Sequence, residues 1–306
     1  MIRLLLILPA LLLTSCGFRN LPTELCTPPT RSFLTTSDQK QLSLAHWNLQ
    51  PSPETIIIGL HGITGAASDF RNLGKTLSSQ SPKTTLYALN LRGNGWDPEP
   101  HKRGDIDHSD LWKRDLRELH QTLAARHPQA SIIWMGESMG ALITLHTASE
   151  GNIRPDGLIL SSPVVSTQSL SSTQRYGLLL AATLAPSYRV SLAALAGGDF
   201  QATANSQHFQ QSKTNPYDIE HFTLRFLKTL ASLTGSMSAK AEANSLPVLI
   251  LHGKKDRFTT SSEIESFVNK FPEEPTLYQF PHSYHLLFFD KNREQPIRQT
   301  LNWLAQ

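Results

Sequence analysis

Apolar residues form two patterns along the chain: short runs that predict strands, and more widely spaced positions that predict helices. Runs that are apolar on both faces, such as residues 55–60, are typical of strands buried in a parallel sheet. The predicted strands are residues 33–35, 42–47, 55–60, 84–91, 131–135, 157–161, 246–252 and 276–280. The predicted helices are residues 69–79, 110–127, 139–149, 261–270 and 293–305. Because helices separate most of the strands, we expect an α/β fold with a mostly parallel sheet covered by helices on both faces.

This alternation stops between residues 163 and 245, where no convincing strand is found. Residues 178–185 and 190–196 are rich in leucine and alanine, but Pro186 and Arg189 interrupt them, so they do not predict a membrane span. Residues 222–233 predict an amphipathic helix. We therefore expect residues 163–245 to be a helical lid insertion in a core made of residues 31–162 and 246–306.

The N-terminal residues predict an export signal. Arg3 precedes an apolar run at residues 4–13, which at about 1.5 Å per residue is too short to span a bilayer. Residues 13–16, Leu-Thr-Ser-Cys, resemble the lipobox of bacterial lipoproteins, in which the cysteine becomes the lipidated first residue of the mature protein. The alternative is an ordinary signal peptide with an incidental cysteine.

The lipobox resemblance implies a signal peptide at residues 1–15 and a lipidated Cys16 that carries acyl chains such as palmitate. Gly17 stands where an aspartate retains lipoproteins at the inner membrane, so the resemblance implies the outer membrane of a bacterial cell envelope. The prolines that follow Cys16 within residues 16–30 indicate an extended linker. Cys26 is then left without an intramolecular partner and predicts a free thiol.

The composition of the 306 residues excludes other classes of protein. A net charge of +3 without a basic stripe gives no support for nucleic-acid binding. The apolar share of 39% and the charged share of 17% are those of a globular chain. Two cysteines cannot form a disulfide framework, and no cysteine–histidine cluster has zinc-site spacing.

Residues 136–140, Gly-Glu-Ser-Met-Gly, fit the G-x-S-x-G pattern. The pattern occurs by chance as well, but here it directly follows a predicted strand and directly precedes a predicted helix. A serine in such a turn is exposed at the carboxyl edge of the sheet and at a helix N-terminus, where developing negative charge is favoured. We therefore expect Ser138 to be a nucleophile.

A nucleophilic serine needs a base, and the base needs an acid that orients it. Asp256 follows the predicted strand 246–252, and His285 follows the strand 276–280, so both fall in the chain order serine, acid, histidine. His282 is a competing base. His285 is preferred because it directly precedes an apolar run. His61 and His252 end strands and are expected to be structural.

The oxyanion of an acyl-transfer intermediate needs two backbone N–H donors. We expect one from Met139, the residue after the nucleophile, and one from Ile63, in the glycine-rich turn after the strand 55–60. The alternative is that residues 61–65 form only a tight turn.

Together these motifs resemble the α/β-hydrolases, in particular the branch of monoacylglycerol lipases, lysophospholipases and serine-aminopeptidase-like hydrolases. The resemblance covers about residues 31–306 and rests on residues 61–65, 92–95, 136–140, 252–256 and 284–285. Asn90 and Asn94 depart from the usual aspartate and histidine, at positions that shape a loop. The resemblance implies the α/β-hydrolase fold and a triad of Ser138, Asp256 and His285, with no metal and no organic cofactor.

The expected function is therefore hydrolysis of carboxylic esters, acylglycerols or lysophospholipids, by a lipid-anchored enzyme. A peptidase or amidase with the same triad is an alternative, and Asp199, Asp218 and Glu220 are the candidates for binding a free amine. A ligand-binding lipoprotein without catalysis is a second alternative. Leu180 and Leu184 in the insertion are expected to contact an acyl chain, although such leucines also serve simply to pack helices. Oligomeric state is not predicted.

Overall fold

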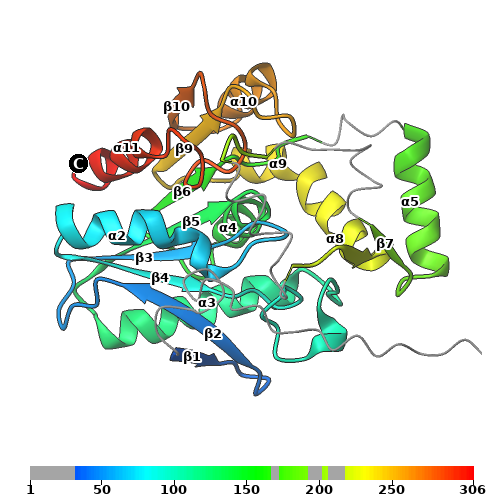
Figure 1. The fold of residues 1–306 in the computed structure, drawn as a ribbon, viewed down its shortest axis with the longest axis horizontal. Helices are drawn as coiled ribbons and strands as arrows, with labels where there is room; N and C mark the ends of the chain where they lie inside the picture. The colour runs from blue at the N-terminus through cyan, green and yellow to red at the C-terminus, as the bar shows by residue number, and fades with distance from the viewer. Residues whose placement is uncertain (1–31, 167–171, 192–201, 206–217) are drawn as a thin grey trace, which may run out of the picture.

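The computed structural model describes residues 32–166, 172–191, 202–205 and 218–306. Cys16, Cys26 and the whole predicted signal and linker lie outside these residues. One sheet of eight strands dominates the fold, in the order β1-β2-β4-β3-β5-β6-β9-β10 (Figure 1). Its strands are β1 Ser32–Thr35, β2 Gln41–Trp47, β3 Thr55–Leu60, β4 Thr84–Leu89, β5 Ser131–Glu137, β6 Gly157–Ser161, β9 Val248–Gly253 and β10 Thr276–Phe280.

Only β2 breaks the parallel direction of the sheet. It pairs antiparallel with β1 and with β4, whereas β4, β3, β5, β6, β9 and β10 are all parallel. The carboxyl ends of the parallel strands therefore meet at one edge of the sheet, and the loops that follow them lie side by side. This confirms the predicted α/β fold.

Helices cover both faces of the sheet. They are α2 Arg71–Gln80, α3 Asp110–Arg126, α4 Met139–Ser149, α10 Ser261–Val268 and α11 Glu294–Leu304, with short 3-10 helices at Ala67–Phe70 (η1) and Pro100–Lys102 (η2). Side chains of α3, α4 and α10 pack with Ile56, Ile58 and Trp134 on one face. Helices α2 and α11 cover the other face (Figure 1). Their side chains pack there with Ile57 and Met135. Alternate residues of one strand thus pack into two separate cores, as expected for a pleated strand buried on both sides.

Residues 162–247, which we call the β6–β9 segment, contain α5 Ser172–Leu184, β7 Arg189–Ser191, β8 His221–Thr223, α8 Leu224–Gly235 and α9 Met237–Glu242. The prediction that this region holds no strand is wrong, because β7 and β8 pair antiparallel in a second small sheet. Each strand has three residues, too few to display a two-residue period, and they are far apart in the sequence. The helix predicted at 222–233 is observed as α8, but β8 takes up its first residues.

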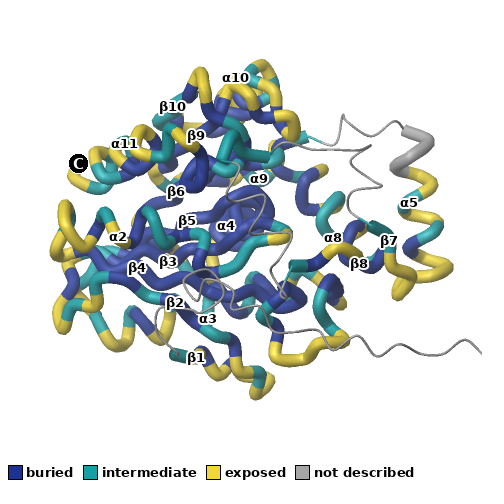
Figure 2. The backbone as a smooth tube through the Cα atoms, viewed as in Figure 1, coloured by how far each residue is buried: buried dark blue, intermediate teal, exposed yellow. Residues whose placement is uncertain are grey.

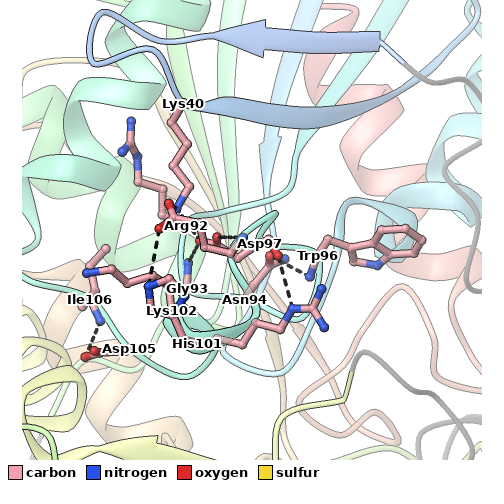
Figure 3. Close-up of polar contacts among 12 residues, drawn as sticks. Lys40, Arg92, Gly93, Asn94, Trp96, Asp97, His101, Lys102, Asp105 and Ile106 are labelled. Carbon is pink, nitrogen blue, oxygen red and sulfur yellow. Dashed lines mark hydrogen bonds and ion pairs between the residues drawn. The ribbon is translucent and has the colours of Figure 1, made fainter.

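The β6–β9 segment is fastened to the core through the loop that follows β4. The carboxylate of Asp105 in this loop accepts hydrogen bonds from Thr223 Oγ1 at 2.6 Å and from Arg225 Nε at 2.7 Å. Asp97 braces the same loop, since it accepts from the backbone N–H of Gly93 at 2.7 Å, and it ties the loop to the β1–β2 turn by accepting from Lys40 Nζ at 2.8 Å (Figure 3). Gly93 has a φ of 74°, and a side chain there would collide with Asp105.

Helices of the β6–β9 segment differ in how far they are enclosed. Leu227, Leu233 and Met237 of α8 and α9 join the core that covers one face of the sheet. Helix α5 packs against α8 and lies farther from the sheet (Figure 1). Most of its residues from 176 to 184 are exposed (Figure 2). Within the described ranges, no helix is long and apolar enough to cross a membrane.

Candidate active site

Ser138 lies in a sharp turn between β5 and α4. Its backbone has φ 52° and ψ −116°, a strained combination for a residue other than glycine. The two glycines of the motif permit this turn, because a Cβ on Gly136 would lie 2.3 Å from the Gly140 carbonyl group, and one on Gly140 would lie 2.0 Å from Leu60 O. The strained turn places the hydroxyl of Ser138 at the carboxyl edge of the sheet and at the N-terminus of α4.

His285 and Asp256 complete a hydrogen-bonded series with Ser138. Ser138 Oγ is 2.8 Å from His285 Nε2, and His285 Nδ1 is 2.7 Å from Asp256 Oδ2. Asp256 is held in turn by the backbone N–H of Phe258, which donates to Oδ1 at 2.8 Å. All three side chains of the series are buried, at 8%, 3% and 7% exposure for Ser138, His285 and Asp256. The structure thus brings together the three residues expected to act as nucleophile, base and acid.

The other histidines considered from the sequence lie elsewhere. His282 is exposed, and it is His285 that reaches Ser138. His252 is buried and its Nε2 lies 2.9 Å from Thr259 O. Burial lowers the pKa of His252, which favours its neutral form.

The two expected oxyanion donors flank Ser138. A Cβ on Gly62 would lie 3.4 Å from Ser138 Cβ, so the Gly62–Ile63 peptide is next to Ser138. The N–H of Ile63 donates to no acceptor among the described residues. Met139 is the first residue of α4, where a backbone N–H has no intrahelical acceptor. The geometry therefore leaves both N–H groups available beside the hydroxyl of Ser138.

His61 holds the turn that contains Ile63. Its Nδ1 is 2.7 Å from Gly62 O, and its Nε2 accepts from Leu91 N at 3.1 Å and from Asn94 Nδ2 at 2.8 Å. Complete burial lowers the pKa of His61 to about 4, so the ring is neutral at neutral pH. Asn94, which departs from the usual histidine, thus shapes a loop as expected.

Residues 51–292 match the family model described as serine aminopeptidase, S33. The chain belongs to this hydrolase family. A monoacylglycerol lipase of Mycolicibacterium smegmatis is 23% identical over 264 residues, covering 85% of this chain and 91% of that protein. A monoglyceride lipase of Rattus norvegicus is 22% identical over 265 residues, covering 83% of this chain and 82% of that protein. An uncharacterized abhydrolase domain-containing protein of Dictyostelium discoideum is 21% identical over 279 residues, and the chain spans 29% of its length.

Solved structures of the α/β-hydrolase fold superpose closely on this family member. The monoacylglycerol lipase of Paleococcus ferrophilus has a TM-score of 0.73 at 19% identity, covering 86% of this chain and 98% of that one. A soluble variant of the monoglyceride lipase of Saccharomyces cerevisiae has a TM-score of 0.76 at 17% identity, covering 91% of this chain and 95% of that one. These likenesses establish the fold.

Two buried carboxyl groups lie beneath the turn of this hydrolase, and the sequence did not single them out. Glu137 directly precedes Ser138, is 2% exposed, and its Oε1 has no hydrogen-bond partner among the described residues. Burial and the nearby charge of Asp69 raise the pKa of Glu137 well above its usual range. Burial also raises the pKa of Asp69 to about 7, although its Oδ2 accepts from Ala66 N at 3.0 Å. Both shifts favour the protonated form of the carboxyl.

Other residues around the base were also missed. Ser162 has a φ of 45°, and its hydroxyl donates to His285 O at 2.6 Å. The Phe258 ring packs against His285, with ring centroids 4.5 Å apart. A serine and an aromatic in separate loops carry no local signal, because only the fold brings them to the imidazole.

The residues expected to contact substrate are less well placed. Leu180 and Leu184 lie on α5 and are 62% and 76% exposed. Asp199 lies outside the described residues, as do the leucines at 192 and 195. Glu220 is exposed and Asp218 is half-buried. Among the described residues, no group of three or more histidine, cysteine or acidic side chains could hold a metal ion.

Proposed function

We propose that the protein is a serine hydrolase that cleaves carboxylic esters, with acylglycerols or lysophospholipids as its substrates. The observation that carries this function is the hydrogen-bonded series Ser138–His285–Asp256 at a strained strand-to-helix turn. Membership of the hydrolase family and the likeness to monoacylglycerol lipases support it.

In the proposed reaction, Ser138 Oγ attacks the ester carbonyl carbon while His285 Nε2 takes the hydroxyl proton. The negative charge that develops on the carbonyl oxygen is stabilised by the N–H groups of Ile63 and Met139. When the tetrahedral intermediate collapses, His285 gives its proton to the leaving alcohol and an acyl-enzyme remains. A water molecule then repeats the sequence, releasing the carboxylic acid and restoring the hydroxyl of Ser138.

Asp256 keeps the imidazole in the required tautomer. Its Oδ2 lies 2.7 Å from Nδ1, so that nitrogen carries the hydrogen and Nε2 is free to accept from Ser138. Burial of Asp256 removes competing water from this contact, and the N–H of Phe258 satisfies its second oxygen. Asp256 thus also stabilises the imidazolium that forms during each proton transfer.

The β6–β9 segment is proposed to form a lid over this site, with α5 supplying an apolar surface for acyl chains. Tyr176, Leu179, Leu180 and Leu184 are all exposed on this helix. At the other end of the chain, the lipobox-like residues 13–16 are proposed to anchor the enzyme through Cys16 to the outer membrane. The same apolar face of α5 would then meet the membrane that carries the substrate.

A fluorophosphonate probe tests the proposed nucleophile, because it phosphonylates an activated serine. We expect stoichiometric labelling of the wild type at Ser138 and none in Ser138→Ala. A panel of acyl esters beside aminoacyl amides then separates an esterase from the aminopeptidase that the family's description makes the second candidate. Preference for the amides would show that the substrates are aminoacyl amides and not esters. The proposed triad would stand in that case.

Detergent-phase partitioning of the wild type and Cys16→Ser tests the anchor. We expect the wild type to enter the detergent phase, and the variant to remain in the aqueous phase or to stay unprocessed. Equal partitioning of the two proteins would remove the lipobox interpretation without affecting the proposed hydrolase activity.

A further inference from the structure

Residues 281–290, which we call the His285 loop, end at a buried aspartate that the proposed mechanism does not use. Asp290 is 0% exposed, and its Oδ2 accepts a hydrogen bond from the N–H of Tyr284 at 2.7 Å. Its Oδ1 accepts from the N–H of Lys291 at 2.8 Å. One carboxylate thus ties the residue just before His285 to the end of the loop.

The same carboxylate also holds a piece of the β6–β9 segment. Oδ1 accepts from the N–H of Ala204 at 3.1 Å, and the hydroxyl of Thr203 lies 3.5 Å away. Further hydrogen bonds run beside these: Leu286 N donates to Ala202 O at 2.9 Å, and Asn205 Nδ2 donates to Phe289 O at 3.0 Å. Residues 202–205, which we call the clasp, therefore bind the His285 loop at both ends of the apolar run that follows His285.

We propose that Asp290 is a positioning residue that holds His285 in place and couples it to the clasp of the β6–β9 segment. This role rests on the hydrolase function proposed above, since it concerns the placement of the general base. It extends that function, because displacement of the clasp by a bound acyl chain or a lipid surface would reach His285 directly.

The charge of Asp290 explains why a neutral side chain is a poor replacement. Among the described residues no cation pairs with Asp290, so the buried carboxylate is stabilised by the N–H groups around it. An asparagine has nearly the same shape, but one of its two terminal atoms is a donor. Whichever way its amide is turned, it faces an N–H where the aspartate accepted one, and the loop has to move.

The chain offers a matched control in Asp105, another buried aspartate that fastens the β6–β9 segment to the core. Asp105 is 6% exposed and accepts from Thr223 Oγ1 and Arg225 Nε, but it lies in the loop after β4 and not in the His285 loop. Asp105→Asn therefore weakens the attachment of the segment without touching the base. A purely structural role for Asp290 predicts that the two variants behave alike.

The test compares the full-length wild type, Asp290→Asn and Asp105→Asn in their rate of fluorophosphonate labelling and in kcat and KM for a short soluble ester. Misplacing the base by a fraction of an ångström to 1 Å costs up to about 10²-fold in rate. We expect Asp290→Asn to label and turn over about 10- to 100-fold more slowly with KM changed little, and Asp105→Asn to stay within about fivefold of the wild type.

A second variant covers the case in which Asp290→Asn does not fold. Asn205→Ala deletes the hydrogen bond from the clasp to Phe289 O, on a half-buried side chain. We expect its labelling rate to fall about fivefold, the equivalent of the ~1 kcal/mol that one hydrogen bond contributes.

The possible outcomes distinguish the proposed hydrolase function from the positioning role of Asp290. A wild type that does not label refutes the proposed hydrolase function itself. A wild type that labels, with Asp290→Asn and Asn205→Ala labelling at the same rate, refutes the positioning role alone. Equal slowing in Asp290→Asn and Asp105→Asn also overturns it, since attachment of the segment would then account for both.

Discussion

Helices α4 and α5 are both rich in leucine and alanine, yet they occupy opposite environments. Every residue of α4 from Met139 to Ala148 is buried, because the helix lies between the sheet and α3, α8 and α9. Helix α5 packs against α8 and leaves Tyr176, Leu180 and Leu184 largely exposed. Apolar composition alone therefore does not tell a core helix from a surface one.

The difference has a functional meaning. In the proposed mechanism helix α4 must be immobile, because its first residue follows Ser138 and its N-terminus would face the developing oxyanion. Helix α5 carries exposed apolar side chains, Tyr176, Leu180 and Leu184 among them, which the proposed function assigns to acyl chains or to a membrane surface. Rigid placement at α4 and an open apolar face at α5 are the two properties that the following experiments separate.

The largest expected effect lies at the start of α4. Ser138→Ala removes the nucleophile, and we expect turnover of a soluble ester to fall by roughly 10⁴-fold or more while the protein stays folded. The matched control is Ser149→Ala at the other end of the same helix, whose hydroxyl donates to His146 O. Retained hydrolysis in Ser138→Ala would assign the chemistry to another residue.

A glycine in each helix tests the contrast in packing. Gly140 in α4 has Leu60 O 2.0 Å from the position of a Cβ, whereas Gly177 in α5 has nothing within 4 Å. We expect Gly140→Ala to lower the free energy of unfolding by about 3 kcal/mol through overpacking. Gly177→Ala should instead raise it by about 0.5–1 kcal/mol, because alanine is the better helix former.

Urea unfolding of the two variants measures both effects. Similar destabilisation by the two substitutions would show that α5 is enclosed like α4, and it would remove the argument for an open apolar face. The sign of the Gly177→Ala effect is therefore the decisive result.

These same elements show what the sequence could predict. The strands 55–60, 157–161 and 276–280 and the helix 139–149 are observed with the predicted bounds, because period and length are local signals. The G-x-S-x-G pattern and the order serine, aspartate, histidine led to the series that the structure places within hydrogen-bonding distance.

What could not be predicted depends on contacts between distant residues. β8 forms where Thr223 meets Asp105, 118 positions earlier, and the clasp is defined by Ala204 meeting Asp290, 86 positions later. Such pairings leave no periodic pattern of apolar residues in the sequence. In the sequence, Glu137 is only the variable residue of the G-x-S-x-G pattern, because no neighbouring residue indicates that Asp69 lies beside it.

A smaller effect concerns pH and the carboxyl that precedes α4. The raised pKa of Glu137 means that the folded protein binds more protons than the unfolded chain above the usual glutamate range, so stability falls as pH rises. Glu137→Gln cannot ionise. We expect the variant to be more stable than the wild type at pH 8 by about 1–3 kcal/mol, the usual cost of an unsatisfied buried group, and to lose this advantage at pH 5.

Urea unfolding at the two pH values checks this expectation. Glu242→Gln is the control for the same substitution at an exposed position, at the end of α9. Asp69 acts in the same direction because its pKa is raised to about 7, so some decline with pH should persist in Glu137→Gln. A constant difference between variant and wild type at both pH values would show that Glu137 does not ionise in this range.

The smallest effect tests the open face of α5. Apolar burial contributes about 0.8 kcal/mol per methylene, so an acyl chain that lies along Leu180 and Leu184 should raise kcat/KM from acetyl to octanoyl esters on monomeric substrates. We expect Leu180→Ser or Leu184→Ser to reduce kcat/KM for octanoyl esters by about fourfold, the equivalent of one methylene, while acetyl esters are hydrolysed as by the wild type. Leu49→Ser is the control, because Leu49 is 50% exposed but lies after β2 and not on α5. A wild type that prefers acetyl esters, with no trend in chain length, would leave the leucines of α5 without a role in substrate binding. Their exposure would then have to be explained by a surface that docks on the membrane without touching the acyl chain in the site.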